Sequence, residues 1–132
     1  MSKLNLTNQF GEVSQFTGGY VEATSSLTFD HSVGAKTVSV CKVGKIVTLN
    51  IPAAAIANGA GTVCASTALP TAYRPSAALT FGVVVIDNGT TRKAGQVIVG
   101  SDGTLTFSVL GTGFTNAAAA GWDACSVSYS LQ

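Results

Sequence analysis

Short runs of β-branched and aromatic residues, separated by turn-forming residues, extend along the whole chain and restrict its fold more than any other feature. The clearest pair is "LTFGVVVID" (79–87) and "RKAGQVIVG" (92–100), which flank Asn88 and Gly89. Asn-Gly between two such runs predicts a type I′ turn, because both central residues of that turn need a positive φ. The sequence therefore predicts a β-hairpin at this point.

Residues 37–51 show the period of two that is typical of a half-buried strand. Val38 and Val40 share one face, whereas Ser39 and Cys41 share the other. Gly44 predicts a bend or bulge, after which the strand resumes over 46–51. Proline cannot donate to a strand ladder, so the strand is expected to end at position 52.

Further strands are predicted elsewhere by the same pattern, at 20–29, 62–66, 104–111 and 126–131, with a tight turn at 100–103. Residues 53–61 ("AAAIANGAG") are expected to form a loop with at most one helical turn. Six to eight short strands predict an all-β fold, an antiparallel, jelly-roll-like β-sandwich. We expect a single sandwich domain over 19–132, preceded by an N-terminal arm over 1–18.

The segment "ALPTAYRPSA" (68–77) lies immediately before the most apolar run. A proline disfavours helical geometry in the residue before it, so the two prolines predict a stiff corner that delivers residues 79–87 into the middle of a sheet. Because 79–87 is apolar at both alternating sets of positions, we expect both faces of this strand to be covered. Tyr73 and Arg74 at the corner either pack locally or contact a ligand. Trp122 either covers the end of the sandwich or stacks on a sugar, because an indole pairs an apolar ring with a donor.

The chain carries little charge. Only 10% of its residues are charged and the net charge is +1, whereas about a quarter is usual for soluble domains. No basic patch is available to neutralise phosphates, so nucleic-acid binding is not expected. The longest strictly apolar run is 83–86, far short of the roughly 20 residues that cross a bilayer, so membrane insertion is not expected either. A surface this poor in charge is instead expected to be covered by identical copies or by a larger particle.

No motif predicts catalysis or metal binding. Cys41, Cys64 and Cys125 form no C-x-x-C pair, and with His31 as the only histidine they offer too few ligands for zinc. The thiols are expected to be buried, or two of them to form one disulfide. His31 has no recognisable nucleophile motif beside it, and "GSDGT" lacks the acidic residues that calcium needs. We therefore predict no enzymatic activity, no metal and no cofactor.

Several segments taken in order carry a family resemblance. "LPTAYRP", an alternating strand, "VIVGSDGTLTF", a tryptophan and a final "SVSYSL" together resemble the C-terminal head domains of bacteriophage tail-fibre and baseplate proteins, over residues 45–131. The resemblance implies a β-sandwich that forms a homotrimer on the virion surface and attaches to the host, often through a surface saccharide, without enzymatic activity. Unlike the usual fibre head, this sequence shows no heptad pattern before the sandwich.

The resemblance suggests which residues on exposed turns contact the host: Tyr73, Arg74, Asn88, Thr91, Arg92, Trp122 and Asp123. Arg92 and Lys93 are expected to form a small positive rim suited to an anionic saccharide. The alternative is a capsid decoration or head-fibre protein that stabilises the particle. In either case the arm over 1–18 is expected to bind other virion proteins.

Overall fold

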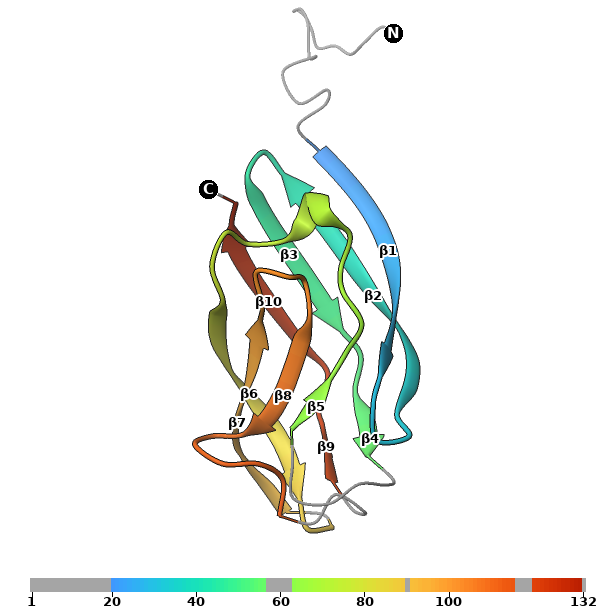
Figure 1. The fold of residues 1–132 in the computed structure, drawn as a ribbon, viewed down its shortest axis with the longest axis vertical. Coiled ribbons are helices and arrows are strands. Elements are labelled where there is room, and N and C mark those ends of the chain that lie inside the picture. Colours follow the sequence, from blue (N-terminus) through green and yellow to red (C-terminus); the bar gives the residue numbers. More distant parts are fainter. Residues whose placement is uncertain (1–19, 57–62, 90, 116–119, 132) are drawn as a thin grey trace, which may run out of the picture.

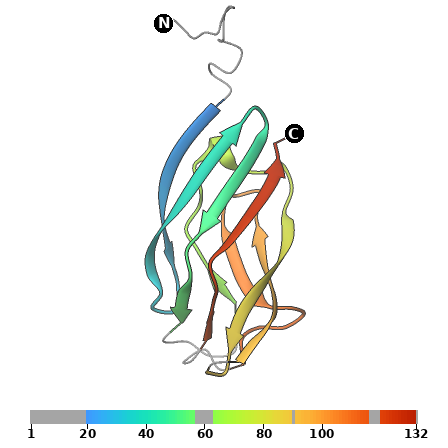
Figure 2. The same cartoon turned by 180° about the vertical axis from the view of Figure 1, so that it is seen from behind.

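The computed structural model describes residues 20–56, 63–89, 91–115 and 120–131, which form two antiparallel sheets packed face to face (Figures 1 and 2). In spatial order, one sheet contains β1 (Tyr20–Phe29), β2 (Gly34–Val43), β3 (Ile46–Ile51) and β10 (Cys125–Ser130). The other contains β4 (Ala54–Ile56), β9 (Ala120–Trp122), β6 (Leu79–Asp87), β7 (Thr91–Val99), β8 (Leu105–Val109) and β5 (Cys64–Ala65). The predicted all-β antiparallel sandwich is confirmed. The predicted arm, residues 1–18, lies outside the described residues.

The described residues contain ten strands rather than the predicted six to eight, because the strand predicted over 37–51 forms two strands and because β4 and β9 were not predicted. One of them, β4, lies where a loop or helical turn was predicted, and this prediction was wrong. Ala54 and Ile56 are buried and face the core, and β4 pairs with β9. A three-residue strand of this kind depends on a partner that is distant in the sequence. Among the described residues, no helix is long and apolar enough to cross a membrane.

Gly44 is a turn residue rather than a bend within one strand. Its φ of 60° lies in the left-handed region, where glycine is favoured, and β2 pairs antiparallel with β3 on either side of it. The predicted faces are correct, because Val38 and Val40 are buried and Ser39 is exposed. The single bent strand was therefore a β-hairpin.

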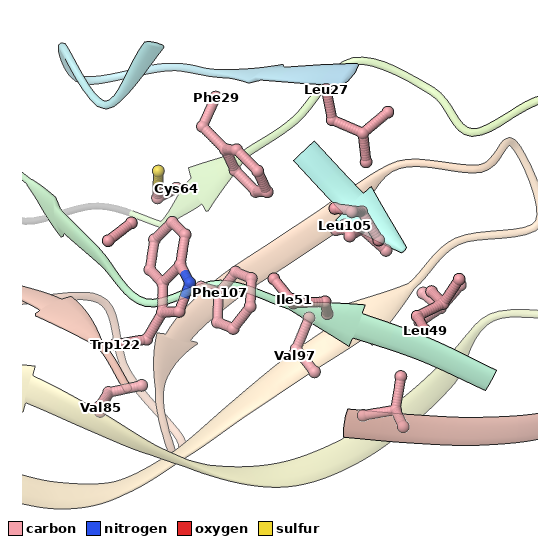
Figure 3. Close-up of a cluster of buried hydrophobic side chains, with 14 of the residues drawn as sticks. Leu27, Phe29, Leu49, Ile51, Cys64, Val85, Val97, Leu105, Phe107 and Trp122 are labelled. Carbon is pink, nitrogen blue, oxygen red and sulfur yellow. The ribbon is translucent and has the colours of Figure 1, made fainter. Parts of the chain in front are cut away.

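The core lies between the two sheets and receives side chains from nearly every strand (Figure 3). Its centre is aromatic. The rings of Phe107 and Trp122 stack with centroids 3.9 Å apart and an interplanar angle of 3°, and Phe29 packs against both rings from the opposite sheet. Aromatic pairs of this kind contribute about 0.5–1.5 kcal/mol beyond the area that they bury.

Strand β6 lies inside the six-stranded sheet, as predicted, between β9 and β7. However, it is covered on one face only. Val85 is 0% exposed on the core side, whereas Val84 on the outer side is 46% exposed. The prediction of two covered faces was wrong, because an apolar run shows what a strand could bury and not what lies against it.

The two ends of the sandwich differ. At one end, which we call the Tyr20 end, β1 begins and β10 ends, since Tyr20, Val43, Ile46 and Ser130 are neighbours across the sheet. The opposite end carries the turn between β6 and β7, and we call it the hairpin end (Figure 1). The predicted corner lies at the Tyr20 end as a 3-10 turn over Thr71–Tyr73, followed by Arg74 in an extended conformation.

Candidate functional site

The hairpin end presents a predicted turn and several polar side chains. Asn88 and Gly89 both have positive φ values, of 56° and 92°, but Asp87 pairs with Thr91, so three residues separate the strands rather than the two of the predicted type I′ turn. The predicted hairpin itself is confirmed. Thr91 and Arg92 follow on β7 with exposed side chains.

Arg92 is engaged with Asp123, which follows β9. The guanidinium donates two hydrogen bonds to the carboxylate, at 2.8 Å from Nε and 3.2 Å from Nη2. The hydrogen bond from Arg92 lowers the pKa of Asp123, and the same bond raises the pKa of Arg92. This bidentate geometry orients both groups, although an ion pair exposed to solvent contributes little to stability.

Lys93 is engaged with the buried carboxylate of Asp87. Its Nζ lies 3.1 Å from Asp87 Oδ2. Thr115 completes the arrangement, because its backbone N–H and its hydroxyl donate to the two carboxylate oxygens at 2.9 and 2.7 Å. A buried carboxylate requires such donors to replace water. Asp87 therefore connects Thr115, which follows β8 in the chain, to the β6–β7 hairpin.

These two ion pairs correct one prediction. Arg92 and Lys93 were expected to present a positive rim, but each contacts a carboxylate, of Asp123 and Asp87 respectively. The hairpin end therefore offers donors and acceptors whose charges compensate one another.

Trp122 does not lie on an exposed turn, and its prediction as a surface contact was wrong. The side chain is 1% exposed and stacks on Phe107, and its Nε1–H donates to the carbonyl of Pro52 at 3.0 Å (Figure 3). Gly121 beside it has no room for a side chain, since a Cβ there would lie 2.2 Å from the carbonyl oxygen of Ala54. Trp122 is therefore a core residue, and Asp123 is the first residue after it that reaches the surface.

Tyr73 and Arg74 lie at the Tyr20 end, away from the other predicted contact residues. Arg74 Nε donates to the carbonyl of Leu69 at 2.8 Å, and the hydroxyl of Tyr129 donates to the carbonyl of Tyr73. Leu69 N–H in turn donates to the carbonyl of Gly103 at 2.9 Å. These bonds join the corner, the turn at 100–103 and the last strand, so Tyr73 and Arg74 organise the fold. The seven predicted residues consequently do not form one site.

The cysteines and the histidine have local structural roles. All three thiols are free, which excludes the predicted alternative of one disulfide. Cys64 is buried, as predicted, whereas Cys41 and Cys125 are half-buried. Burial raises the pKa of the Cys64 thiol and raises that of Cys125 to about 11. His31 contacts the carbonyl oxygen of Val63 at 3.0 Å. In the part of the chain that the structure describes, no three His, Cys, Asp or Glu side chains gather as metal ligands do.

A groove at the Tyr20 end was not predicted. It has a volume of about 520 Å³ and lies between β6 and β10, with Pro75, Leu79, Phe81 and Tyr129 among its walls. The apolar residues of 79–83 were the sequence signal for this groove, but we interpreted them as part of a strand whose two faces are both covered.

A scan against protein-family models and a search of curated proteins found no match. Among solved structures, the chain is similar to the reovirus attachment protein sigma1, crystallised in complex with alpha-2,3-sialyllactose. The similarity covers 86% of this chain and 67% of that chain, with 18% identity and a TM-score of 0.48. A similarity of this degree carries no conclusion about the ligand or partners of this chain.

Proposed function

We propose that this chain is the head domain of a bacteriophage tail-fibre or baseplate protein, located on the virion surface, where a homotrimer attaches to the host through a surface saccharide without enzymatic activity. The observation that supports this best is the contact between the segments that carry the sequence resemblance. Leu69 of "LPTAYRP" bonds to Gly103 of "GSDGT", and Tyr129 of "SVSYSL" bonds to Tyr73.

These contacts explain why the segments occur together in one order. Gly103 has a φ of 90°, and a Cβ there would lie 2.7 Å from Arg74 Nε and 2.9 Å from Leu69 N. The turn must therefore keep glycine at this position so that the corner can pack against it. The resemblance thus rests on residues that depend on one another physically, rather than on independent short matches.

The hairpin end is the better surface for the host. β1 begins and β10 ends at the Tyr20 end, so a connection to a particle through residues 1–18 leaves the hairpin end pointing away. Asn88, Thr91, Arg92 and Asp123 remain there as the contact residues. Because Arg92 and Asp123 compensate each other, they offer donors and acceptors to the hydroxyl groups of a neutral saccharide.

Sister subunits are proposed to cover apolar surface at the Tyr20 end. Tyr20, Val43 and Ile46 are neighbours across β1, β2 and β3, and each is exposed. Burying apolar surface is the main driving force of stable association between identical chains. This patch is therefore the proposed contact within a trimer.

Host-cell adsorption and glycan-array binding test the proposal with two variants. Thr91→Ala with Arg92→Ala is expected to weaken binding at least about ten-fold, because direct hydrogen bonds to charged groups contribute roughly 1.5–3 kcal/mol. Ser26→Ala, an exposed change on the four-stranded sheet, is the matched control. Light scattering is expected to give the mass of a trimer. Wild-type protein that binds its particle but neither cells nor glycans would instead establish the decoration function.

A further inference from the structure

We propose that the groove between β6 and β10 binds a short, extended and uncharged peptide segment of a partner protein, which pairs with the open edge of β6 as an additional β-strand. The proposed attachment function places the host contact at the hairpin end, and this inference does not rest on it. The groove at the Tyr20 end is a second binding surface.

The ladder alternation shows which backbone groups of β6 point toward the groove. Leu110 N–H donates to the carbonyl of Ala94, so the even-numbered residues of β7 bond toward β8. Bonded residues alternate along an antiparallel ladder, so the odd-numbered residues of β7 bond toward β6, where they pair with its odd-numbered residues. The N–H and carbonyl groups of Thr80 and Gly82 therefore point the other way, out of the β6–β7 ladder.

Strand β9 covers this edge of β6 only in part. It pairs with residues 85–86, and Asp123 N–H donates to the carbonyl of Val84 at 3.2 Å, which agrees with even-numbered residues of β6 bonding on this side. In the part of the chain that the structure describes, no strand continues along the edge to Thr80 and Gly82. Each of these two residues thus directs one N–H and one carbonyl into the open seam between the sheets.

An extended peptide is the class of ligand that matches these backbone groups. Thr80 and Gly82 are two residues apart, so their donors and acceptors repeat along the edge at about 7 Å, twice the rise of a strand. An antiparallel strand presents its own acceptors and donors at the same repeat, and peptides that bind to sheet edges are held by such main-chain bonds. A saccharide does not carry this regular repeat.

The groove provides a place for the side chains of an added strand. Val85, opposite β9, is fully buried, whereas Leu79, Phe81 and Val83 point to the same side of the sheet and are only partly buried. Phe81 and Tyr129 form the wall of the groove with ring centroids 6.4 Å apart. Alternate side chains of the added strand would enter this space and extend the core, while the others meet solvent.

The walls of the groove also indicate the chemistry of the peptide. The described residues that line it include prolyl, aliphatic, aromatic and hydroxyl side chains, but no Asp, Glu, Lys, Arg or His. A charged side chain entering the groove would lose water without gaining an ion pair. The inward-facing residues of the peptide are therefore expected to be apolar.

The open part of the edge is short and is bounded at both ends. Asp123 lies on it beside Val84, and the chain bends at residues 76–77 before β6 begins. Residues 79–83 remain, which accommodate a strand of roughly 17 Å. A stable interface between two folded copies buries about 1,200–2,000 Å² in total, far more than one such strand contact provides. We therefore assign the edge to a short linear segment rather than to a second copy.

This edge lacks the features that prevent pairing with other chains. Natural edge strands use charged side chains, prolines or bulges for this purpose. Residues 79–83 contain no charge and no proline, and β6 pairs with β7 without interruption from Leu79 to Asp87. A Cβ at Gly82 would meet no atom within 4 Å, so another backbone can approach closely.

The opposite seam of the sandwich is closed. There Asp30 N–H donates to the carbonyl of Ala65 at 3.0 Å. Thr67 N–H donates to the carbonyl of Thr28 at 2.9 Å. These bonds join β1 to the segment that contains β5, so the two sheets are linked on that side. The difference between the two seams marks the edge of β6 as the place where the sandwich accepts a further strand.

Solvent-exchange NMR of the full chain with synthetic peptides tests this proposal. The probes are three acetylated and amidated pentapeptides with threonine at the second and fourth positions and valine, isoleucine or phenylalanine at the other three. Paired in register with residues 79–83, the threonines bond to Thr80 and Gly82, and the apolar residues enter the groove. Main-chain pairing tolerates different side chains, so at least one probe should slow exchange of both amides about ten-fold at ten times its Kd.

N-methylated peptides separate edge pairing from apolar adhesion. Methylation of the two threonine amides removes the donors that face β6, and it should abolish binding. Methylation of the central apolar residue is the matched control, because its N–H points away from β6, and it should preserve binding.

Two variants of the protein test the groove and the edge separately. Phe81→Ala removes part of the groove wall and should weaken peptide binding at least about ten-fold. Gly82→Pro removes one donor of the open edge without a bond to β7, and it should weaken binding as well. Val84→Ala, a truncation on the exposed outer face of the same strand, is the matched control and should leave the affinity unchanged.

Four results would overturn the proposal. They are binding by none of the three peptides at millimolar concentration, binding that survives methylation of the threonine amides, slow exchange of Thr80 and Gly82 in the free protein, and a saccharide that occupies the groove in place of the peptides. Slow exchange that rises with protein concentration would assign the edge to a second copy, and slow exchange independent of concentration would assign it to this chain itself. Host-cell adsorption, which tests the hairpin end, is independent of all four.

Discussion

Truncating Trp122 to alanine is the most direct test of the core. From the sequence, this residue could either pack on the sandwich or lie on the surface as a ligand contact. Removing a buried aromatic side chain costs about 3–5 kcal/mol. Trp122→Ala also loses the 3.9 Å stack on Phe107 and leaves the carbonyl of Pro52 without its indole donor. This bond is only partly buried, so its loss adds about 1 kcal/mol, the ordinary net contribution of a hydrogen bond. We therefore expect the free energy of unfolding to fall by about 4–5 kcal/mol.

Thermal unfolding followed by far-ultraviolet circular dichroism measures this loss. For a chain of 132 residues, 1 kcal/mol corresponds to a shift in Tm of roughly 3–4 °C, so the variant should melt about 15 °C below the wild type. Arg92→Ala is the matched control. It removes an exposed ion pair close to Trp122, and it should leave the Tm nearly unchanged, because exposed ion pairs contribute little to stability.

Fluorescence quenching gives an independent measurement, because the chain contains a single tryptophan. Iodide should quench the native protein weakly and the unfolded protein strongly. A Trp122→Ala variant within about 1 kcal/mol of the wild type, or a native indole that iodide quenches freely, would refute the packing described above. The same result would restore Trp122 as a candidate surface contact.

Three further predictions concern a turn, an ion pair and a thiol. In urea unfolding, Gly103→Ala should lower the free energy of unfolding by about 1–3 kcal/mol more than Gly89→Ala does. Both glycines have φ near 90°, but only at position 103 would a Cβ clash with neighbouring atoms. Equal losses of stability would contradict the packing of the corner. Arg92 lowers the pKa of Asp123, so this pair stabilises the fold above the unfolded carboxyl's pKa and its contribution disappears as the pH falls through the lower folded value. In an NMR titration, Arg92→Ala should move the Asp123 pKa upward, and an unchanged value would disprove the pairing. Iodoacetamide should modify Cys64 only upon unfolding, because burial raises the pKa of its thiol; rapid labelling of the native chain would place Cys64 at the surface.

The strand pattern was predictable because it depends on neighbours in the sequence. Asn88 and Gly89 adopt the positive φ values that their residue types favour, and Val38 and Val40 face the core as their spacing predicted. The stiff corner before β6 also formed as the two prolines required, since a proline restricts its own backbone and that of the preceding residue. Each of these features is decided within a few residues.

The features that the sequence could not indicate depend on contacts between distant segments. β4 is a strand because β9, more than sixty residues later, pairs with it. Trp122 is a core residue because Phe29 and Phe107 arrive from two other strands to surround its ring. Arg92 does not form the predicted positive rim, because Asp123, which follows β9, pairs with it.

The sequence by itself determined that this protein is an antiparallel β structure with a hairpin at Asn88 and Gly89, because periodicity and turn chemistry act locally along the chain. Only the tertiary structure decided which apolar faces are covered and which charges are paired. Burial and pairing depend on which distant strand lies alongside, and side-chain periodicity carries no record of that partner.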